Sequence, residues 1–133
     1  MKIRNIDKLR FTERDVKFNA GNSIRFLLEK DGMGFSFHQT EMKKSDKFYY
    51  WHYKNHKECC YCIQGFAEIR DLETGETFEI RVGDMYILDR NQRHEFRPIE
   101  DTILISVFNP PVTGNEIHDE NGSYILNKKK IKQ

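Results

Sequence analysis

The chain has 133 residues, with 22 Lys and Arg against 21 Asp and Glu, a formal net charge of +1. Its length predicts one domain with a substantial core, and its balanced charge gives no reason to expect a nucleic-acid partner or an anionic membrane surface. It has no apolar run of the roughly 20 residues that a membrane span needs and no signal-peptide core near Met1, so we expect a cytoplasmic protein.

Short runs of β-branched and aromatic residues, each closed by turn residues, recur along the chain. Before residue 23 only a short helical stretch is indicated, near residues 6–16. A hairpin tip is predicted at residues 73–76, because Phe78 and Ile80 alternate with charged residues just after it. The predicted strands cover residues 23–29, 34–42, 49–53, 58–64, 67–72, 77–81, 84–88, 94–97 and 102–109.

This pattern of elements predicts an all-β protein. No repeat, linker or low-complexity stretch divides it, so residues 1–126 are expected to form a single antiparallel β-barrel. The basic segment at residues 127–133 is expected to be a solvated tail.

Three cysteines, Cys59, Cys60 and Cys62, lie within one predicted strand. The Cys59–Cys62 spacing is that of redox and zinc sites. On a strand, however, an odd separation points the two side chains to opposite faces. We therefore expect small core residues, and clustered thiols also suit a reducing compartment.

Two segments carry a pattern typical of metal-binding barrels. Glu58 is followed by Gly65, and a second segment begins with Gly83 and ends with His94. This order, a glutamate and a glycine followed later by a second glycine and a histidine, resembles the two motifs of the cupin superfamily. That resemblance implies a cupin-type jelly roll, whose interior often presents histidines and a carboxylate to a first-row divalent metal.

The residues around these motifs limit the ligand set. The histidine pair that normally precedes the carboxylate is disrupted here at His52 and His56. Tyr86 is a candidate replacement, because a phenolate is a hard oxygen donor. Glu58, Tyr86 and His94 together favour iron, as Fe²⁺, or another first-row divalent ion. The alternatives are that Tyr86 is a core aromatic, Glu58 a residue of the barrel mouth and His94 a turn residue.

A narrower resemblance, to the ectoine synthase family, runs from Met1 to about Leu126. It implies an iron-binding cupin that closes N-γ-acetyl-L-2,4-diaminobutyrate into the cyclic amidine ectoine with loss of water. It also implies a homodimer. The family's metal ligands match Glu58, Tyr86 and His94. The strings that carry the resemblance are DGMGFSFHQT (31–40), HYKNHKE (52–58), YCIQG (61–65), VFNPPVTG (107–114) and EIHDENGSY (116–124).

The same resemblance implies a substrate pocket and proton-transfer groups. Arg25 is expected to clamp the substrate carboxylate, although it has Glu29 as an alternative partner. Residues 114–124 are expected to close the barrel against water. The alternatives are that the aromatic residues only fill the barrel and that residues 116 and 118 only pin the end of the chain. The pocket positions implied for substrate binding are Ser23, Arg25, Thr40, Ser106 and Phe108, and those for proton transfer are Tyr53, Glu116 and His118.

Two positions depart from the family pattern. Gly21 stands in place of a tryptophan, and Ser106 in place of a cysteine. The loss of an indole is expected to loosen the substrate wall, with Phe18 as a neighbouring aromatic that refills the gap. These departures leave two other functions open: a different metal-cupin enzyme acting on a small carboxylate, or a non-catalytic cupin that binds a small molecule.

Overall fold

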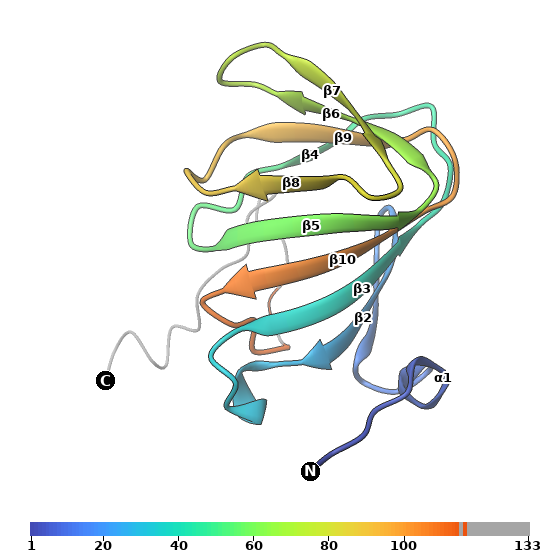
Figure 1. Ribbon diagram of the computed structural model, residues 1–133, viewed down its shortest axis with the longest axis vertical. Helices are drawn as coiled ribbons and strands as arrows, with labels where there is room; N and C mark the ends of the chain where they lie inside the picture. Colours follow the sequence, from blue (N-terminus) through green and yellow to red (C-terminus); the bar gives the residue numbers. More distant parts are fainter. Residues whose placement is uncertain (115, 117–133) are drawn as a thin grey trace.

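Two antiparallel β-sheets face one another across the interior of the molecule (Figure 1). The computed structural model describes residues 1–114 and 116. Outside the sheets lie helix α1 (Ile6–Leu9) and the 3-10 turn η1 (Glu29–Asp31). The strands are β1 (Asp15–Phe18), β2 (Gly21–Leu27), β3 (Ser36–Met42), β4 (Tyr49–Trp51), β5 (Lys57–Gln64), β6 (Phe66–Asp71), β7 (Thr77–Arg81), β8 (Met85–Leu88), β9 (His94–Pro98) and β10 (Thr102–Asn109).

The order of the strands differs from their order in the sequence. One sheet has six strands in the order β1-β2-β3-β10-β5-β8, and the other has four in the order β4-β9-β6-β7. Strand β10 therefore lies between β3 and β5, and consecutive strands such as β8 and β9 belong to different sheets. Repeated crossing between two antiparallel sheets is characteristic of a jelly roll. The predicted all-β antiparallel fold is confirmed.

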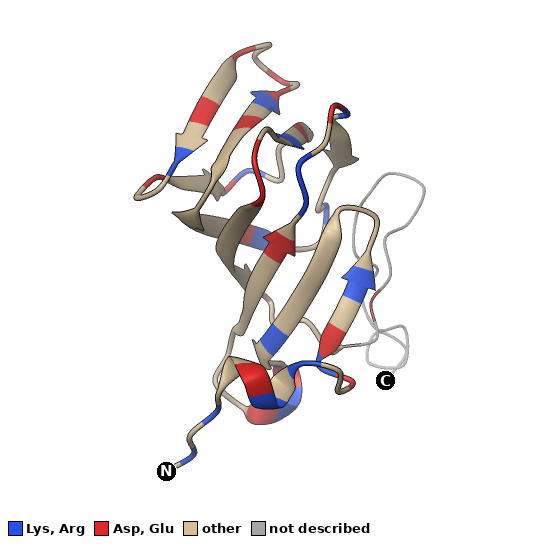
Figure 2. Cartoon of the chain, turned by 90° about the vertical axis from the view of Figure 1, so that its right-hand side faces the viewer, with Lys and Arg blue, Asp and Glu red and all other residues tan. Residues whose placement is uncertain are grey.

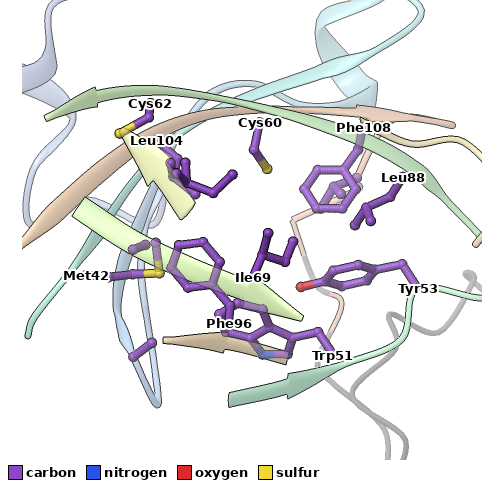
Figure 3. Packing of buried hydrophobic residues seen from close by; sticks show 14 of the residues in the cluster. Met42, Trp51, Tyr53, Cys60, Cys62, Ile69, Leu88, Phe96, Leu104 and Phe108 are labelled. Carbon is purple, nitrogen blue, oxygen red and sulfur yellow. The ribbon is translucent and has the colours of Figure 1, made fainter. Parts of the chain in front are cut away.

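Side-chain alternation explains how these strands build a core. Strand β10 buries every second residue from Thr102 to Phe108, and β5 does the same with Glu58, Cys60 and Cys62. Because one face of each strand points inward, the interior receives polar groups as well as hydrophobic ones. Figure 3 shows the hydrophobic ones among them, including Cys60 and Leu104, in one cluster with Trp51 and Phe96 of the facing sheet.

The cysteines lie as the alternation predicts. Cys60 and Cys62 are buried and Cys59, on the other face of β5, is only partly covered. All three are free thiols. The Cys59–Cys62 pair therefore does not converge into a redox or zinc site.

The first part of the chain differs from its prediction. Residues 15–18 form β1, which pairs with β2 in a tight hairpin from Phe18 to Gly21, whereas only a short helical stretch was expected there. The observed helix is limited to α1, which Asn5 caps by accepting a hydrogen bond from the backbone N–H of Asp7. The predictions for residues 77–81 and 102–109 match β7 and β10.

Charged residues are distributed over the described surface without a continuous region of one sign in the view of Figure 2. One cluster is structural: Asp31 lies 2.8 Å from Arg4 and 3.0 Å from Arg14 and ties the N-terminal segment to the end of β2. In the described part of the chain, no helix is long and apolar enough to cross a membrane.

Candidate metal and substrate site

A small cavity of about 30 Å³ lies between the two sheets. This volume suits a water molecule or a single ion, and a substrate enters only if side chains move. Its walls come from β1–β5, β8 and β10 and from the segment that follows β4. Most predicted site residues meet here, and those that line the cavity are Ser23, Thr40, Tyr53, Glu58, Tyr86, Ser106 and Phe108.

Glu58 is an interior residue. Its exposed fraction is 8 %, so it is not a surface residue of the barrel mouth. Burial raises the pKa of the Glu58 carboxyl to about 8, against a hydrogen bond with Cys60 that lowers it. A carboxyl group that is neutral for lack of a countercharge is suited to receive a cation, which would stabilise its ionised form.

Tyr86 lies directly across from Cys60 in the pairing of β5 with β8. Burial, with Cys60 and Glu58 close by, raises the pKa of the Tyr86 hydroxyl well above its ordinary value. Cys60 lies close to both Tyr86 and Glu58, and its sulfur is 3.4 Å from the Ser106 hydroxyl. The structure therefore brings two of the three predicted ligands, Glu58 and Tyr86, into one cluster around the Cys60 thiol.

His94 begins β9 and is 1 % exposed. Its Nδ1 lies 3.1 Å from the carbonyl oxygen of Gln92, and its Nε2 is buried without a hydrogen-bond partner in the described part of the chain. Burial lowers the pKa of His94 to about 4, so the ring is neutral. A buried imidazole nitrogen with a free lone pair is in the state that a metal ligand requires.

The His94 ring does not itself line the cavity. It lies beside two residues that do: its centroid is 6.2 Å from that of Trp51 and 6.1 Å from that of Tyr53. The loop before it is anchored by Asn91, whose amide donates hydrogen bonds of 2.8 Å to the Tyr53 carbonyl and 2.9 Å to the His56 carbonyl.

The donor set fits a hard divalent cation. The Glu58 carboxyl and the Tyr86 phenol line a cavity large enough for an ion, and the His94 ring, with Nε2 lacking a partner among the described residues, lies beside Trp51 and Tyr53 of the cavity wall. Within residues 1–114 and 116, no three His, Cys, Asp or Glu side chains form a metal-binding group on their own. A three-ligand site here therefore needs the Tyr86 phenol.

Another part of the cavity wall centres on His38 of β3, which lies two strands from Glu58 in the same sheet. Its Nδ1 lies 3.2 Å from the Ser23 hydroxyl, and its ring centroid is 5.2 Å from that of Phe108. Burial lowers the pKa of His38 well below its ordinary value. Next to it, the Thr40 and Ser106 hydroxyls lie 3.0 Å apart. Ser106, one of the two departures from the family pattern, is thus part of a hydroxyl pair on the cavity wall.

Arg25 is buried beside His38, its partner in the pairing of β2 with β3. It does not line the cavity. Its Nε and Nη1 atoms have no hydrogen-bond partner among the described residues. Buried guanidinium N–H groups without partners are costly, and a carboxylate that accepts a hydrogen bond from one of them would reduce that cost.

The expectation for Gly21 is wrong. A Cβ atom at this position would lie 1.9 Å from the backbone oxygen of Glu41 on β3, so no side chain fits there without moving the strand. Gly21 also does not line the cavity. Phe18 does, and its ring centroid lies 6.1 Å from that of Trp51. The aromatic wall is therefore present, but residue 18 forms it.

Glu116 is held by backbone groups. Its carboxylate accepts hydrogen bonds from the N–H groups of Thr113 and Gly114 at 2.7–2.9 Å. Burial opposes ionisation, but these hydrogen bonds outweigh it and lower the pKa of Glu116. This geometry matches the alternative in which the residue pins the end of the chain. His118 and the predicted closing segment beyond Glu116 lie outside the described residues.

Two interior residues were missed in the sequence analysis. Cys60 was treated only as core, and His38 was not singled out. Strand alternation placed Cys60 inward, but its contacts with Glu58 and Tyr86 depend on the register between strands. Nothing in the sequence alone indicates that His38 contacts Ser23 and Phe108.

Comparison with known proteins gives matches over nearly the whole chain. A family described as ectoine synthase matches residues 1–128. The L-ectoine synthase of Thermobifida fusca is 46 % identical over 126 residues, which cover 95 % of this chain and 93 % of that protein. The crystal structure of ectoine synthase from P. lautus has a TM-score of 0.84 and 41 % identity, and the match covers 95 % of this chain and 91 % of that one.

A more distant likeness concerns the fold alone. The cupin domain of Schizosaccharomyces pombe Cnp3 superposes with a TM-score of 0.56 at 17 % identity, covering 65 % of this chain and 62 % of that domain. The predicted cupin architecture is confirmed.

Proposed function

Since this chain belongs to the ectoine synthase family, we propose that it closes its substrate ring at a metal ion held by Glu58, Tyr86 and His94. The reaction is the one predicted from the resemblance, the cyclising dehydration of N-γ-acetyl-L-2,4-diaminobutyrate to ectoine, and the enzyme is a hydro-lyase. The family match therefore does not support the two alternative functions, which were a different metal-cupin enzyme and a non-catalytic cupin that binds a small molecule.

One observation carries the proposal of a metal centre. The buried Glu58 and the partly buried Tyr86 line one cavity of ionic size, and the neutral His94 ring keeps Nε2 without a partner in the described chain. We propose Fe²⁺ as the ion, because a carboxylate, a phenolate and an imidazole are the donors that first-row divalent metals accept. When bound, such an ion polarises a carbonyl as a Lewis acid and stabilises charge on its oxygen.

The remaining residues orient the substrate. The Thr40 and Ser106 hydroxyls and the face of Phe108 form one wall of the cavity. They would hold the flexible chain folded, with the α-amino nitrogen against the amide carbon. Holding two reacting groups in this way can lower the barrier by several kcal/mol. A substrate carboxylate that reaches Arg25 would give its Nε or its Nη1 a hydrogen-bond partner.

Proton transfer is assigned to Tyr53. Its ring meets Phe108 edge-on, with centroids 5.3 Å apart, and Figure 3 shows its hydroxyl pointing into the interior. We propose that it donates a proton to the oxygen that leaves as water. Glu116 orders the segment after β10 through Thr113 and Gly114, and so it positions rather than reacts. For His118 the proton-transfer role remains a prediction.

We further propose a homodimer that joins through the outer face of β5 and β8. Tyr61 and Ile63 on β5 and Met85 and Ile87 on β8 are 42–61 % exposed, although all four are large and apolar. Strand β8 is also a free edge of its sheet, the kind of edge that proteins cover. A second copy of the chain would bury this face. The free thiols support a reducing, cytoplasmic location.

A direct assay tests the function. Protein loaded anaerobically with Fe²⁺ is incubated with N-γ-acetyl-L-2,4-diaminobutyrate, and ectoine is followed by proton NMR. The proposal expects turnover that disappears in the apoprotein and returns when Fe²⁺ is restored. Equal turnover by the metal-free protein would contradict the metal centre, whereas binding of the substrate without any product would contradict the enzyme.

A further inference from the structure

We propose that Asn91 is a positioning residue of the reaction, whose side-chain amide fixes the backbone of Tyr53 and so aims the Tyr53 hydroxyl into the site. This inference rests on the proposed function, in which Tyr53 donates a proton. It goes beyond that function, because it makes the proton transfer depend on a residue that does not itself reach the reacting atoms.

Asn91 lies where two connections between the sheets meet. The chain passes from the four-stranded sheet to the six-stranded one between β4 and β5, at residues 52–56, and returns between β8 and β9, at residues 89–93. Both connections lie at the same end of the molecule (Figure 1), as the pairing of β5 with β8 and of β4 with β9 requires. Tyr53 belongs to the first connection and Asn91 to the second.

The Asn91 amide joins the two connections through both of its N–H groups. Its Nδ2 atom donates a hydrogen bond of 2.8 Å to the Tyr53 carbonyl and one of 2.9 Å to the His56 carbonyl. An amide nitrogen has two hydrogens to donate, and here each of them has an acceptor. Because the two acceptors are three residues apart, one side chain holds the first connection at two points.

The backbone of Asn91 has the conformation of a tight turn. Its φ angle is +56°, in the left-handed region that asparagine adopts more readily than most residues other than glycine. A non-glycine residue keeps this conformation only where its surroundings hold it there. The two hydrogen bonds of the side chain provide that support, so the turn and the amide contact stabilise each other.

Tyr53 is the residue that depends most on this contact. It follows the end of β4 and precedes β5, so the hydrogen bonds of a sheet do not hold it in place. Its ring is nonetheless buried and meets Phe108 edge-on at an interplanar angle of 82°, with its hydroxyl directed into the interior (Figure 3). That hydroxyl lies at the far end of a long side chain, and a misplacement of about 1 Å can cost roughly 100-fold in rate.

Steady-state kinetics with saturating Fe²⁺ test the role of Asn91. Asn91→Gly removes both donors and keeps the left-handed backbone without steric cost, and Asn91→Asp keeps the size but replaces the donors by acceptors. In both variants kcat should fall at least about tenfold. KM should stay within about threefold, because the walls that bind the substrate are unchanged. Arg90→Ala, an exposed side chain of the same connection, is the control and should keep the wild-type kcat.

A double-mutant cycle separates positioning of Tyr53 from a general loss of structure. If Asn91 acts through the Tyr53 hydroxyl, Asn91→Gly should lower kcat by no more than about twofold when Tyr53→Phe is already present. Two effects that multiply would instead show that Asn91 acts independently of Tyr53, and they would overturn the proposal.

The remaining outcomes are equally clear. A thermal melt of each variant gives its folded fraction, and a loss of activity that the unfolded fraction accounts for overturns the positioning role. Wild-type kcat in Asn91→Gly does the same and leaves the proposed function in place. A wild type that forms no ectoine overturns the proposed function itself and, with it, any role of Asn91 in the reaction.

Discussion

The Nδ1 atom of His94 lies 3.1 Å from the carbonyl oxygen of Gln92, and this contact determines which ring nitrogen is available to a metal. A carbonyl oxygen only accepts hydrogen bonds, so Nδ1 carries the proton and Nε2 of the neutral ring has the lone pair. The sequence places His94 at the first residue of β9, and the turn before it supplies the oxygen that orients the ring. The backbone therefore prepares this histidine for coordination before any ion arrives.

Replacing His94 tests this arrangement. His94→Gln keeps the size and polarity of the side chain but removes the imidazole nitrogen, so Fe²⁺ affinity should fall more than about tenfold. His52→Gln is a matched control, because His52 is only partly buried and is not a proposed ligand. Isothermal titration of both apoproteins with Fe²⁺ measures the difference. Equal affinities in the two variants would remove His94 from the ligand set.

A second prediction concerns acid stability. The pKa of Asp31 is held well below its usual range, chiefly by its hydrogen bond with Arg4 and also by Arg14. A carboxylate with a lowered folded-state pKa stabilises the protein above its unfolded value of about 4. That contribution is lost as the pH falls below this value towards the folded-state pKa. Asp31→Asn should cost on the order of 2 kcal/mol at pH 7.

Urea melts from pH 7 down to pH 3 measure this contribution, with Asp46→Asn at an exposed position as the control. The gap between wild type and Asp31→Asn should narrow as the pH drops through the acid range. A gap that is constant with pH would show that the charge of Asp31 does not stabilise the fold.

Many of the strands could be predicted from the sequence, because the alternation of hydrophobic and polar residues along a strand is visible within a few neighbouring residues. Strands β7 and β10 were predicted with their observed bounds. Strand β1 was missed because its four residues are too few to distinguish a strand from a helical turn. Its conformation depends on the pairing with β2, which the sequence does not display.

The site was predictable only in part, for the same reason. The motif residues Glu58 and Tyr86 meet as expected, because alternation points both inward from paired strands. Cys60 and His38 acquire their surroundings from residues 26 and 15 positions away, Tyr86 and Ser23. The error at Gly21 has a similar origin, because only the structure reveals the Glu41 oxygen that excludes a side chain.

Gly21 and Phe18 should therefore respond differently to substitution. Gly21→Ala forces a Cβ against the Glu41 backbone and should lower stability by about 2 kcal/mol or more. The Gly21→Ala molecules that do fold should have the same KM as the wild type. Phe18→Ala removes a cavity wall and should raise KM roughly tenfold. Melting curves and steady-state kinetics on both variants separate these effects. A large change of KM in Gly21→Ala would place residue 21 at the substrate after all.

The dimer proposal predicts that a charge on the outer face of β8 separates the protomers. Ile87 is 61 % exposed and Phe78, on β7 of the other sheet, is 46 % exposed. Ile87→Asp should convert a dimer to a monomer in sedimentation velocity, because burying an unpaired carboxylate is costly. Phe78→Asp should leave the dimer intact. A wild type that sediments as a monomer at micromolar concentration would contradict the proposed interface.

The most direct measurement is the Fe²⁺ affinity of Tyr86→Phe compared with that of Tyr53→Phe. Both variants lose only a hydroxyl from a tyrosine that lines the same cavity, but only Tyr86 is proposed to bind the metal. We predict that Tyr86→Phe loses at least about tenfold in Fe²⁺ affinity, while Tyr53→Phe binds Fe²⁺ as the wild type does and loses turnover. Wild-type Fe²⁺ affinity in Tyr86→Phe would contradict a metal centre that depends on this phenolate.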